Sequence, residues 1–196
     1  MNETEINHIY DEFRVPKHII NHMRAVADVC LFISSKFEEK GIQLKEKELL
    51  SAALLHDTLR ICDMRDYSPK KFPQKIEADD LQIWNEIRKK YQKKGHELAM
   101  ADILRDRGEK YIANLVEKHH FLKIDVLQSW EEKVMYYADK RVNHDQVVSL
   151  QERFDEGRKR NIVAAEKKKE SLEIELRVFA LESELADVLG ECIYSL

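Results

Sequence analysis

Two residues that could do chemistry stand at the end of an apolar run, Ala52-Ala53-Leu54-Leu55-His56-Asp57. The run ends abruptly in an imidazole, His56, and a carboxylate, Asp57. Both groups can bind a metal ion, and burying an ion without a partner costs on the order of several kcal/mol. We therefore expect other polar groups, or a cation, to lie beside this pair.

Four more polar residues fall on inward-facing helical positions: His22, His96, His119 and Asp139. Each shares a helical face with apolar residues at steps of three and four, so each points toward the core. His18 lies one turn before His22, on the same side. The apolar residues that define these faces are Ile19, Met23, Val26, Cys30, Ala99, Met100, Ile103, Ile112, Leu115, Val116, Met135 and Val142.

Each of these residues taken alone has an ordinary structural explanation. A lone histidine on an apolar face is more often a hydrogen-bonded core residue than a ligand. For Asp139 the ordinary explanation is a salt bridge to Lys140, Arg141 or a more distant arginine. Together on separate helices, they favour one shared polar site.

The elements that would position these side chains are helices. Only five glycines and three prolines interrupt the 196 residues, and the apolar residues follow helical periods with almost no alternating runs. We expect helices around residues 17–40, 47–56, 81–91, 96–107, 112–119 and 130–142. The fold class predicted is all-α.

The composition changes near residue 150, which suggests a domain of residues 1–150 and a helical extension of residues 151–196. The extension carries two apolar stripes, typical of a helix contacted from two sides. It is expected to pack on the domain, to mediate oligomerisation as a homo-oligomer, or both. Its basic clusters, Arg158-Lys159-Arg160 and Lys167-Lys168-Lys169, are interpreted as solvated faces, with binding of phosphate or of an acidic partner as the alternative.

The segment from Cys62 to Gln74 lacks a sustained period and contains Pro69 and Pro73 beside Lys70-Lys71. Such a segment predicts a loop. A loop here could cover the polar site, and a passive connection with solvated charges explains it equally well.

Charge and cysteine usage exclude several classes of function. The net charge of -4 includes no basic field over the domain, so nucleic acid is not an expected partner. The three cysteines are far apart, which favours reduced thiols. With no apolar run of about 18 residues, no membrane association is expected and the predicted location is cytoplasmic.

The order His22, His56-Asp57, Asp139 resembles the HD superfamily of metal-dependent phosphohydrolases. The likeness is carried by His22-Met23-Arg24-Ala25-Val26-Ala27, by the run ending in His56-Asp57, and by Tyr136-Tyr137-Ala138-Asp139-Lys140, and it covers about residues 17–154. It implies an HD-domain helical bundle, here with a long C-terminal helix. It also implies that His22, His56, Asp57 and Asp139 are the primary metal ligands.

Branches of the superfamily with two metals add two histidines between the His-Asp pair and the last aspartate, and His96 and His119 are similar in position. His120 could replace or supplement His119. The implied cofactor is one or two divalent metal ions (Mn, Fe, Co, Ni, Zn or Mg), with Asp57 as the bridge if there are two. His144-Asp145 has no apolar run before it and is interpreted as surface.

Many relatives continue the pair as His-Asp-Ile-Gly-Lys, whereas this chain has Thr58-Leu59-Arg60. Arg60 keeps a positive charge that can bind phosphate in a forked geometry. The resemblance implies Asp57 and Arg60 as catalytic residues. The expected substrate-binding residues are Arg60, His120, Lys140 and Arg24. Phe121-Leu122-Lys123 stands where the cyclic-dinucleotide branch has Gly-Tyr-Pro, so that substrate is not expected.

The first hypothesis is a phosphohydrolase that uses metal-activated water to cleave a phosphate ester or anhydride of a small phosphorylated molecule. The expected molecule is a nucleotide. The alternative is a non-catalytic HD-fold regulatory or binding module whose C-terminal helix contacts a partner. A third hypothesis is a helical bundle whose histidines only fill the core.

Overall fold

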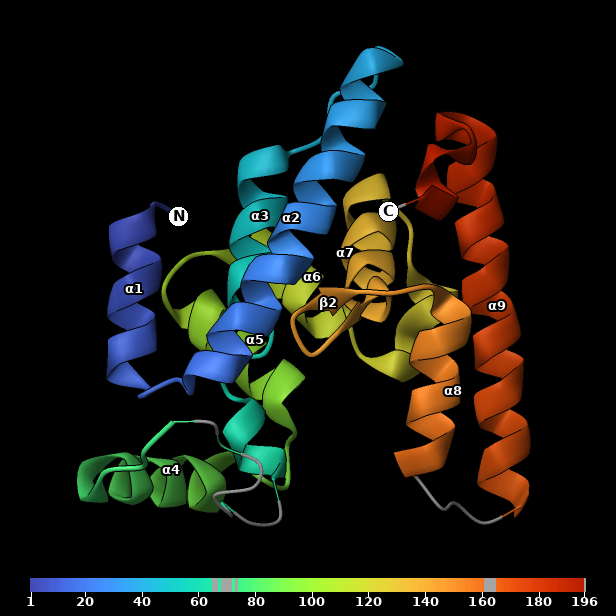
Figure 1. The fold of residues 1–196 in the computed structure, drawn as a ribbon. Coiled ribbons are helices and arrows are strands. Elements are labelled where there is room, and N and C mark those ends of the chain that lie inside the picture. The colour runs from blue at the N-terminus through green and yellow to red at the C-terminus, as the bar shows by residue number, and fades with distance from the viewer. Residues whose placement is uncertain (65–66, 68–71, 73, 161–164, 196) are drawn as a thin grey trace.

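The computed structural model describes residues 1–64, 67, 72, 74–160 and 165–195, and it confirms the all-α prediction. Figure 1 shows the arrangement. The α-helices are α1 (Glu3–Glu12), α2 (Lys17–Glu39), α3 (Glu46–Leu55), α4 (Ala78–Tyr91), α5 (His96–Asp106), α6 (Lys110–Lys118), α7 (Trp130–Arg141), α8 (Leu150–Arg160) and α9 (Ala165–Leu189). Short 3-10 helices are η1 (Arg60–Asp63), η2 (Phe121–Val126) and η3 (Glu191–Ser195), and the strands are β1 (Val142–Asn143) and β2 (Gln146–Val147).

Helix α3 is the centre of the core. It packs against α2 on one side and against α6 and α7 on the others, while α5 packs on α6. Its residues Leu49, Ala52, Ala53 and Leu55 are fully buried, as expected for a helix that is apolar almost all round. The small alanines let the neighbouring helices approach closely, and the polar pair follows at the buried end.

Three of the candidate histidines lie at helix ends. His56 directly follows the last residue of α3, His119 directly follows α6, and His96 is the first residue of α5. Before His96, Gly95 has a φ of +85°, a conformation that glycine adopts without a steric penalty. Backbone groups at helix ends lack partners within the helix, so these positions can bond to side chains.

The chain reverses directly after α7 in a small antiparallel pair, with Val142 opposite Val147. His144 in this turn has a φ of +57°. The buried guanidinium of Arg141 donates from Nε to the carbonyl of Val148 at 2.6 Å and from Nη1 to the carbonyl of Ile193 at 2.8 Å. One side chain therefore fixes both the hairpin and the C-terminal segment to α7.

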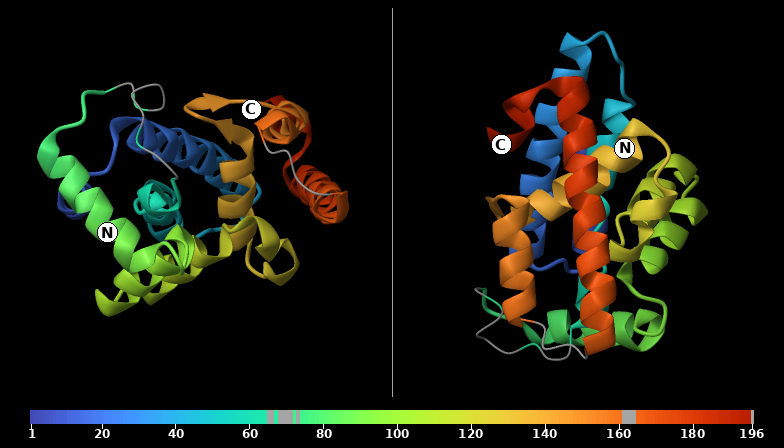
Figure 2. Two further views of the ribbon diagram at one scale, coloured as in Figure 1. Left: turned by 90° about the horizontal axis from the view of Figure 1, so that it is seen from below. Right: turned by 90° about the vertical axis from the view of Figure 1, so that its right-hand side faces the viewer.

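The helical pattern beyond residue 150 forms two helices, α8 and α9, rather than one uninterrupted helix. They lie side by side (Figures 1 and 2), with Arg158 bonded to Glu175 and the ring of Phe154 edge-on to Phe179. The two expected stripes on α9 differ in burial. Ile174, Val178 and Leu181 of one stripe are buried, and α9 contacts α2, α7 and η2. Leu172 and Leu176 of the other stripe are exposed, so the expected contact on a second side does not cover them. The boundary at residue 150 and oligomerisation stay predictions.

Two expectations lie outside the described residues. Pro69, Lys70, Lys71 and Pro73 belong to the segment that was expected to form a loop, and the side chains of Lys167 and Lys168 belong to one basic cluster. Among the helices that are described, none is long and apolar enough to cross a bilayer.

Candidate metal centre

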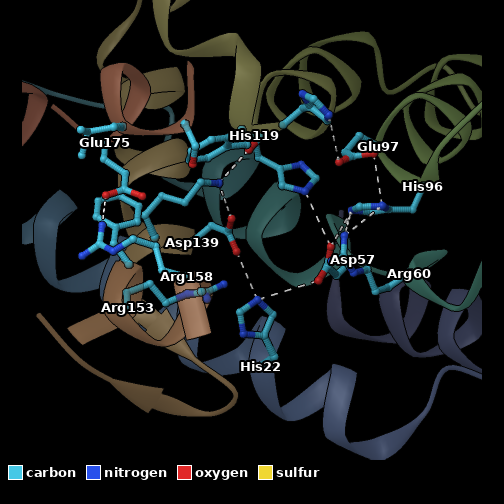
Figure 3. A pocket seen from close by; sticks show the side chains of 17 residues that line it. His22, Asp57, Arg60, His96, Glu97, His119, Asp139, Arg153, Arg158 and Glu175 are labelled. Carbon is cyan, nitrogen blue, oxygen red and sulfur yellow. Dashed lines mark hydrogen bonds and ion pairs between the residues drawn. The ribbon is translucent and has the colours of Figure 1, made fainter. Parts of the chain in front are cut away.

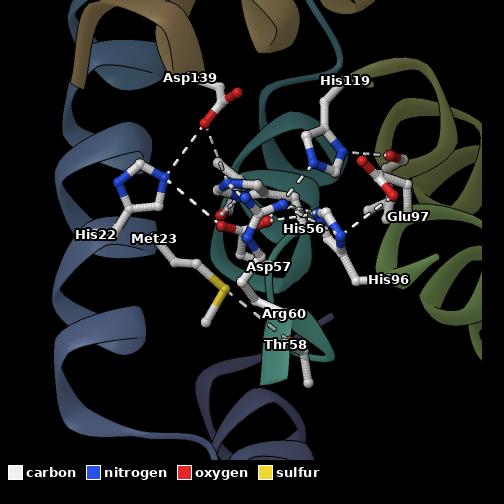
Figure 4. A network of polar contacts seen from close by, with 12 residues as sticks. His22, Met23, His56, Asp57, Thr58, Arg60, His96, Glu97, His119 and Asp139 are labelled. Carbon is white, nitrogen blue, oxygen red and sulfur yellow. Dashed lines mark hydrogen bonds and ion pairs between the residues drawn. The ribbon is translucent and has the colours of Figure 1, made fainter. Parts of the chain in front are cut away.

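Helices α2, α3, α5, α6 and α7 bring the candidate ligands to one point in the interior (Figure 4). All six residues expected to bind metal meet there. They are His22, His56, Asp57, His96, His119 and Asp139.

His22 is oriented by the backbone of the β-hairpin. Its Nδ1 lies 2.7 Å from the carbonyl oxygen of His144, so Nδ1 carries the proton and donates it. The other nitrogen, Nε2, then faces Oδ1 of Asp139 at 3.2 Å and Oδ2 of Asp57 at 3.9 Å. The side chain of His144 is exposed, as expected, but its carbonyl fixes the ring of His22.

His56 and His119 are oriented in the same way by their own helices. Nδ1 of His56 donates to the carbonyl of Ala53 at 2.7 Å, and Nδ1 of His119 donates to the carbonyl of Val116 at 2.5 Å. In both cases the acceptor lies three residues earlier, in the last turn of the helix, where carbonyl groups lack partners within the helix. This hydrogen bond selects the tautomer that leaves Nε2 available as a ligand.

A buried nitrogen of His56 has no hydrogen-bond partner among the described residues. This atom, Nε2, is 3.5 Å from Oδ1 of Asp139 and 4.0 Å from Oδ1 of Asp57. An unpartnered buried polar atom is costly, and native structures seldom keep one without a reason. A metal ion between the imidazole and the carboxylates would satisfy it, so the donor set fits a divalent cation.

His96 is held by carboxylates on both ring nitrogens. Nε2 lies 2.9 Å from Oδ1 of Asp57, and Nδ1 lies 2.5 Å from Oδ2 of Asp63. Burial alone would lower the pKa of His96, but Asp57 and Asp63 outweigh it and raise the pKa to about 9. The guanidinium of Arg60 contacts the same ring, with Nη1 3.2 Å from Nε2.

The two aspartates of the centre remain ionised. Burial would raise the pKa of Asp57, but the imidazoles of His56 and His96 hold it well below its usual range. Burial opposes ionisation of Asp139 too, but Lys140 and the neighbouring imidazole of His22 lower the pKa of Asp139. The ammonium of Lys140 donates to Oδ2 of Asp139 at 2.6 Å, which leaves Oδ1 facing the histidines.

Of the two adjacent histidines, His119 is the one buried in the centre. Its Nε2 is 3.7 Å from Oδ1 of Asp57, and burial lowers the pKa of His119 to about 4, so the ring is neutral. His120 is 40% exposed at its side chain, and its Nδ1 accepts from the backbone N–H of Leu122. The geometry therefore favours His119 as the ligand.

Three sets of residues place their ligand atoms within 4.8 Å of one another. These sets are His22, His56 and Asp139; His56, Asp57 and His119; and His96, Glu97 and His119. His56 and His119 each belong to two sets. The arrangement has donors for one ion or for two neighbouring ions.

The centre opens into a cavity of about 540 Å³ (Figure 3). The expected substrate-binding residues Arg60, His120 and Lys140 line this cavity, whereas Arg24 is exposed and is not among the described residues that line it. Arg24 follows His22 by two positions, about 200° around the helix, so the two cannot share a face.

Sequence reasoning missed several residues of this site. Asp63 lies on η1 beyond the His-Asp pair, and Glu97 lies beside His96 with its side chain only 14% exposed. Glu97 directly follows His96, and this adjacency was an available signal, whereas no local pattern indicated Asp63. The other missed residues are Phe121 of η2 and seven residues of α8 and α9, namely Arg153, Phe154, Gly157, Arg158, Ser171, Leu172 and Glu175.

Comparisons with known proteins identify one family. A family model described as HD domain matches residues 19–181 of this chain. Searches of curated proteins and of solved structures gave no match.

Proposed function

The chain belongs to the HD domain family, broadly one of metal-dependent phosphohydrolases, and we propose that it hydrolyses a phosphate ester or anhydride of a small molecule, namely a nucleotide. The observation that carries the proposal is the shared orientation of three imidazoles. His22, His56 and His119 each donate Nδ1–H to a backbone carbonyl and direct Nε2 toward Asp57 or Asp139.

Histidines that only filled the core would not need this shared orientation. Histidines that bind metal almost always donate a hydrogen bond from their other ring N–H to a carbonyl or carboxylate, which fixes the tautomer. Here the Nε2 atoms of His22, His56 and His119 point toward two ionised carboxylates. A divalent ion held by them would supply a Lewis acid for the phosphoryl group and an activated water.

The other polar residues of the cavity would bind the substrate and stabilise its charge. Arg60 and Lys140 line the cavity beside Asp57 and Asp139, where their positive charges would oppose the charge that develops on phosphoryl oxygens. Lys140 also holds Asp139 through Oδ2. His120 is neutral at its half-exposed position because burial lowers its pKa, so it would contact substrate as a hydrogen-bonding group.

The test is a metal analysis of purified protein followed by a screen of phosphorylated metabolites. We expect bound divalent metal and release of phosphate or a nucleoside phosphate, and we expect Asp57→Ala to abolish this release. Bound metal with no turnover on any phosphorylated compound would favour the non-catalytic binding module instead. A matched control is Asp28→Ala, which removes an exposed carboxylate from α2.

A further inference from the structure

The cavity beside the metal centre has a second wall made by the C-terminal helices. Residues from α8 and α9 face the histidines and aspartates across it (Figure 3). A volume of about 540 Å³ falls within the range of roughly 300–1,000 Å³ that is usual for small-molecule sites. The space therefore accommodates more than a single phosphoryl group.

Two cations of this cavity, Lys140 and Arg158, are bonded to carboxylates. Lys140 is bonded to Asp139 and to the carbonyl of His119. Arg158 is paired with Asp155 and Glu175, which links α8 to α9. Both cations already donate to carboxylate oxygens, so neither leaves a buried nitrogen without an acceptor.

Arg153 differs from these cations. Its Nε is buried and has no hydrogen-bond partner in the described part of the chain, and its ion pair with Glu156 spans 4.0 Å. The side chain extends from α8 into the cavity (Figure 3). A buried arginine nitrogen without an acceptor destabilises the fold unless a ligand supplies that acceptor.

Apolar side chains line the same cavity as Arg153. Phe154 is the next residue on α8, Phe121 comes from η2, and Leu172 on α9 is 52% exposed. Leucine and phenylalanine side chains in a cavity that also contains a guanidinium suit a ligand that has an apolar or flat part and an anionic group.

We propose that Arg153 binds an anionic phosphate oxygen of the ligand, while Phe121 and Leu172 contact its organic part. The C-terminal helices would then select an organic phosphate over a bare phosphate. This inference rests on the proposed function, because it assigns the substrate class of the same site. An arginine can bind a phosphate with two parallel hydrogen bonds, whereas a lysine offers a single point charge.

The experiment measures binding rather than turnover. Protein loaded with Mn²⁺ is titrated by calorimetry with inorganic phosphate and with a nucleoside 5′-phosphonate, which is not hydrolysed. Arg153→Gln removes the charge and Arg153→Lys keeps it, while Lys159→Gln is the matched control because Lys159 is exposed on the same helix. Leu172→Asn is paired with Leu176→Asn, a more exposed position on α9.

We expect the phosphonate to bind more tightly than phosphate, and Arg153→Gln to weaken both by about tenfold or more. Arg153→Lys should recover part of this loss, and Lys159→Gln should match the wild type. Leu172→Asn should weaken only the phosphonate, with Leu176→Asn unchanged. Metal content should be equal in all variants.

The proposal is overturned if the wild type does not prefer the phosphonate, or if Arg153→Gln binds it as the wild type does. The outcome is separate from that of the proposed function. If the wild type hydrolyses nothing but Arg153→Gln loses ligand binding, the binding site is supported and the enzyme is refuted. If the wild type hydrolyses a nucleotide but Arg153→Gln binds the phosphonate unchanged, the enzyme is supported and the role of Arg153 is refuted.

Discussion

Nε2 of His56 faces Oδ1 of Asp139 at 3.5 Å, with no hydrogen bond between the two atoms. Nδ1 of His56 donates to the carbonyl of Ala53, so Nε2 is the ring atom that faces the ionised carboxylate of Asp139. A buried ring nitrogen without a hydrogen-bond partner is costly, and a cation held between the ring and the carboxylate would satisfy it. This contact is the strongest structural reason to expect a metal ion.

The first prediction concerns metal-dependent stability. Because a metal that binds only the folded state stabilises it, chelation should lower the melting temperature of the wild type, by the equivalent of about 2.7 kcal/mol when free metal exceeds its Kd by roughly 100-fold. His56→Ala should have the same melting temperature with and without chelator. His8→Ala, which removes an exposed histidine, should respond like the wild type. Equal responses of His56→Ala and the wild type would contradict the assignment.

The second prediction concerns Asp63, which accepts from Nδ1 of His96. Asp63→Asn keeps the size of the side chain but removes the charge that orients and polarises the ring. Metal affinity should fall by about 10- to 100-fold, because partners of metal-bound histidines contribute this much. Calorimetry with Mn²⁺ measures it. Asp28→Asn on the exposed side of α2 should leave affinity unchanged, and no change in Asp63→Asn would remove His96 from the ligand set.

The third prediction concerns pH. Without metal, the pKa of His96 is raised to about 9, so the ring is protonated at pH 7 and the bound proton must leave when metal binds. Metal affinity should therefore increase with pH up to about 9, by about tenfold per unit for one released proton. Titrations in buffers of different ionisation enthalpy count the protons. Constant affinity from pH 7 to pH 9 would show that His96 releases none.

The fourth prediction concerns a structural carboxylate away from the metal centre. Burial would raise the pKa of Glu132, but hydrogen bonds from Lys118, Gln128 and Asn114 lower it. A carboxylate with a lowered folded pKa stabilises the fold above its unfolded pKa, and this stability is lost as pH falls through the folded pKa.

Glu132→Gln should therefore cost about 2 kcal/mol of unfolding free energy at pH 7, and less in strong acid. Urea unfolding at several pH values measures the difference. Glu86→Gln, at an exposed position on α4, should cost little. A loss in Glu132→Gln that stays the same at all pH values would show that its charge does not contribute.

The fold and the ligand cluster were predictable because helical periodicity records which residues face inward. His22, His96, His119 and Asp139 share faces with apolar residues, and the structure brings all of them to His56 and Asp57. The same periodicity places Arg24 on the opposite side of α2 from His22, and Arg24 is exposed in the structure.

The remaining features depend on contacts that no local pattern contains. His144 acts through its carbonyl, and any residue type has a carbonyl, so its identity gave no indication of this role. Arg153 and Leu172 reach the cavity because α8 and α9 pack side by side, and two stripes on a helix indicate burial without identifying the neighbours. Asp63 depends on the position of η1 relative to α5.

The most direct test of the central claim is an anomalous difference map from crystals grown with Mn²⁺, combined with metal analysis of the same protein. We predict a peak bounded by Nε2 of His22, Nε2 of His56 and Oδ1 of Asp139, with a stoichiometry of one or two ions per chain. A map without a peak among these atoms, from protein whose analysis shows no bound divalent metal, would contradict the account.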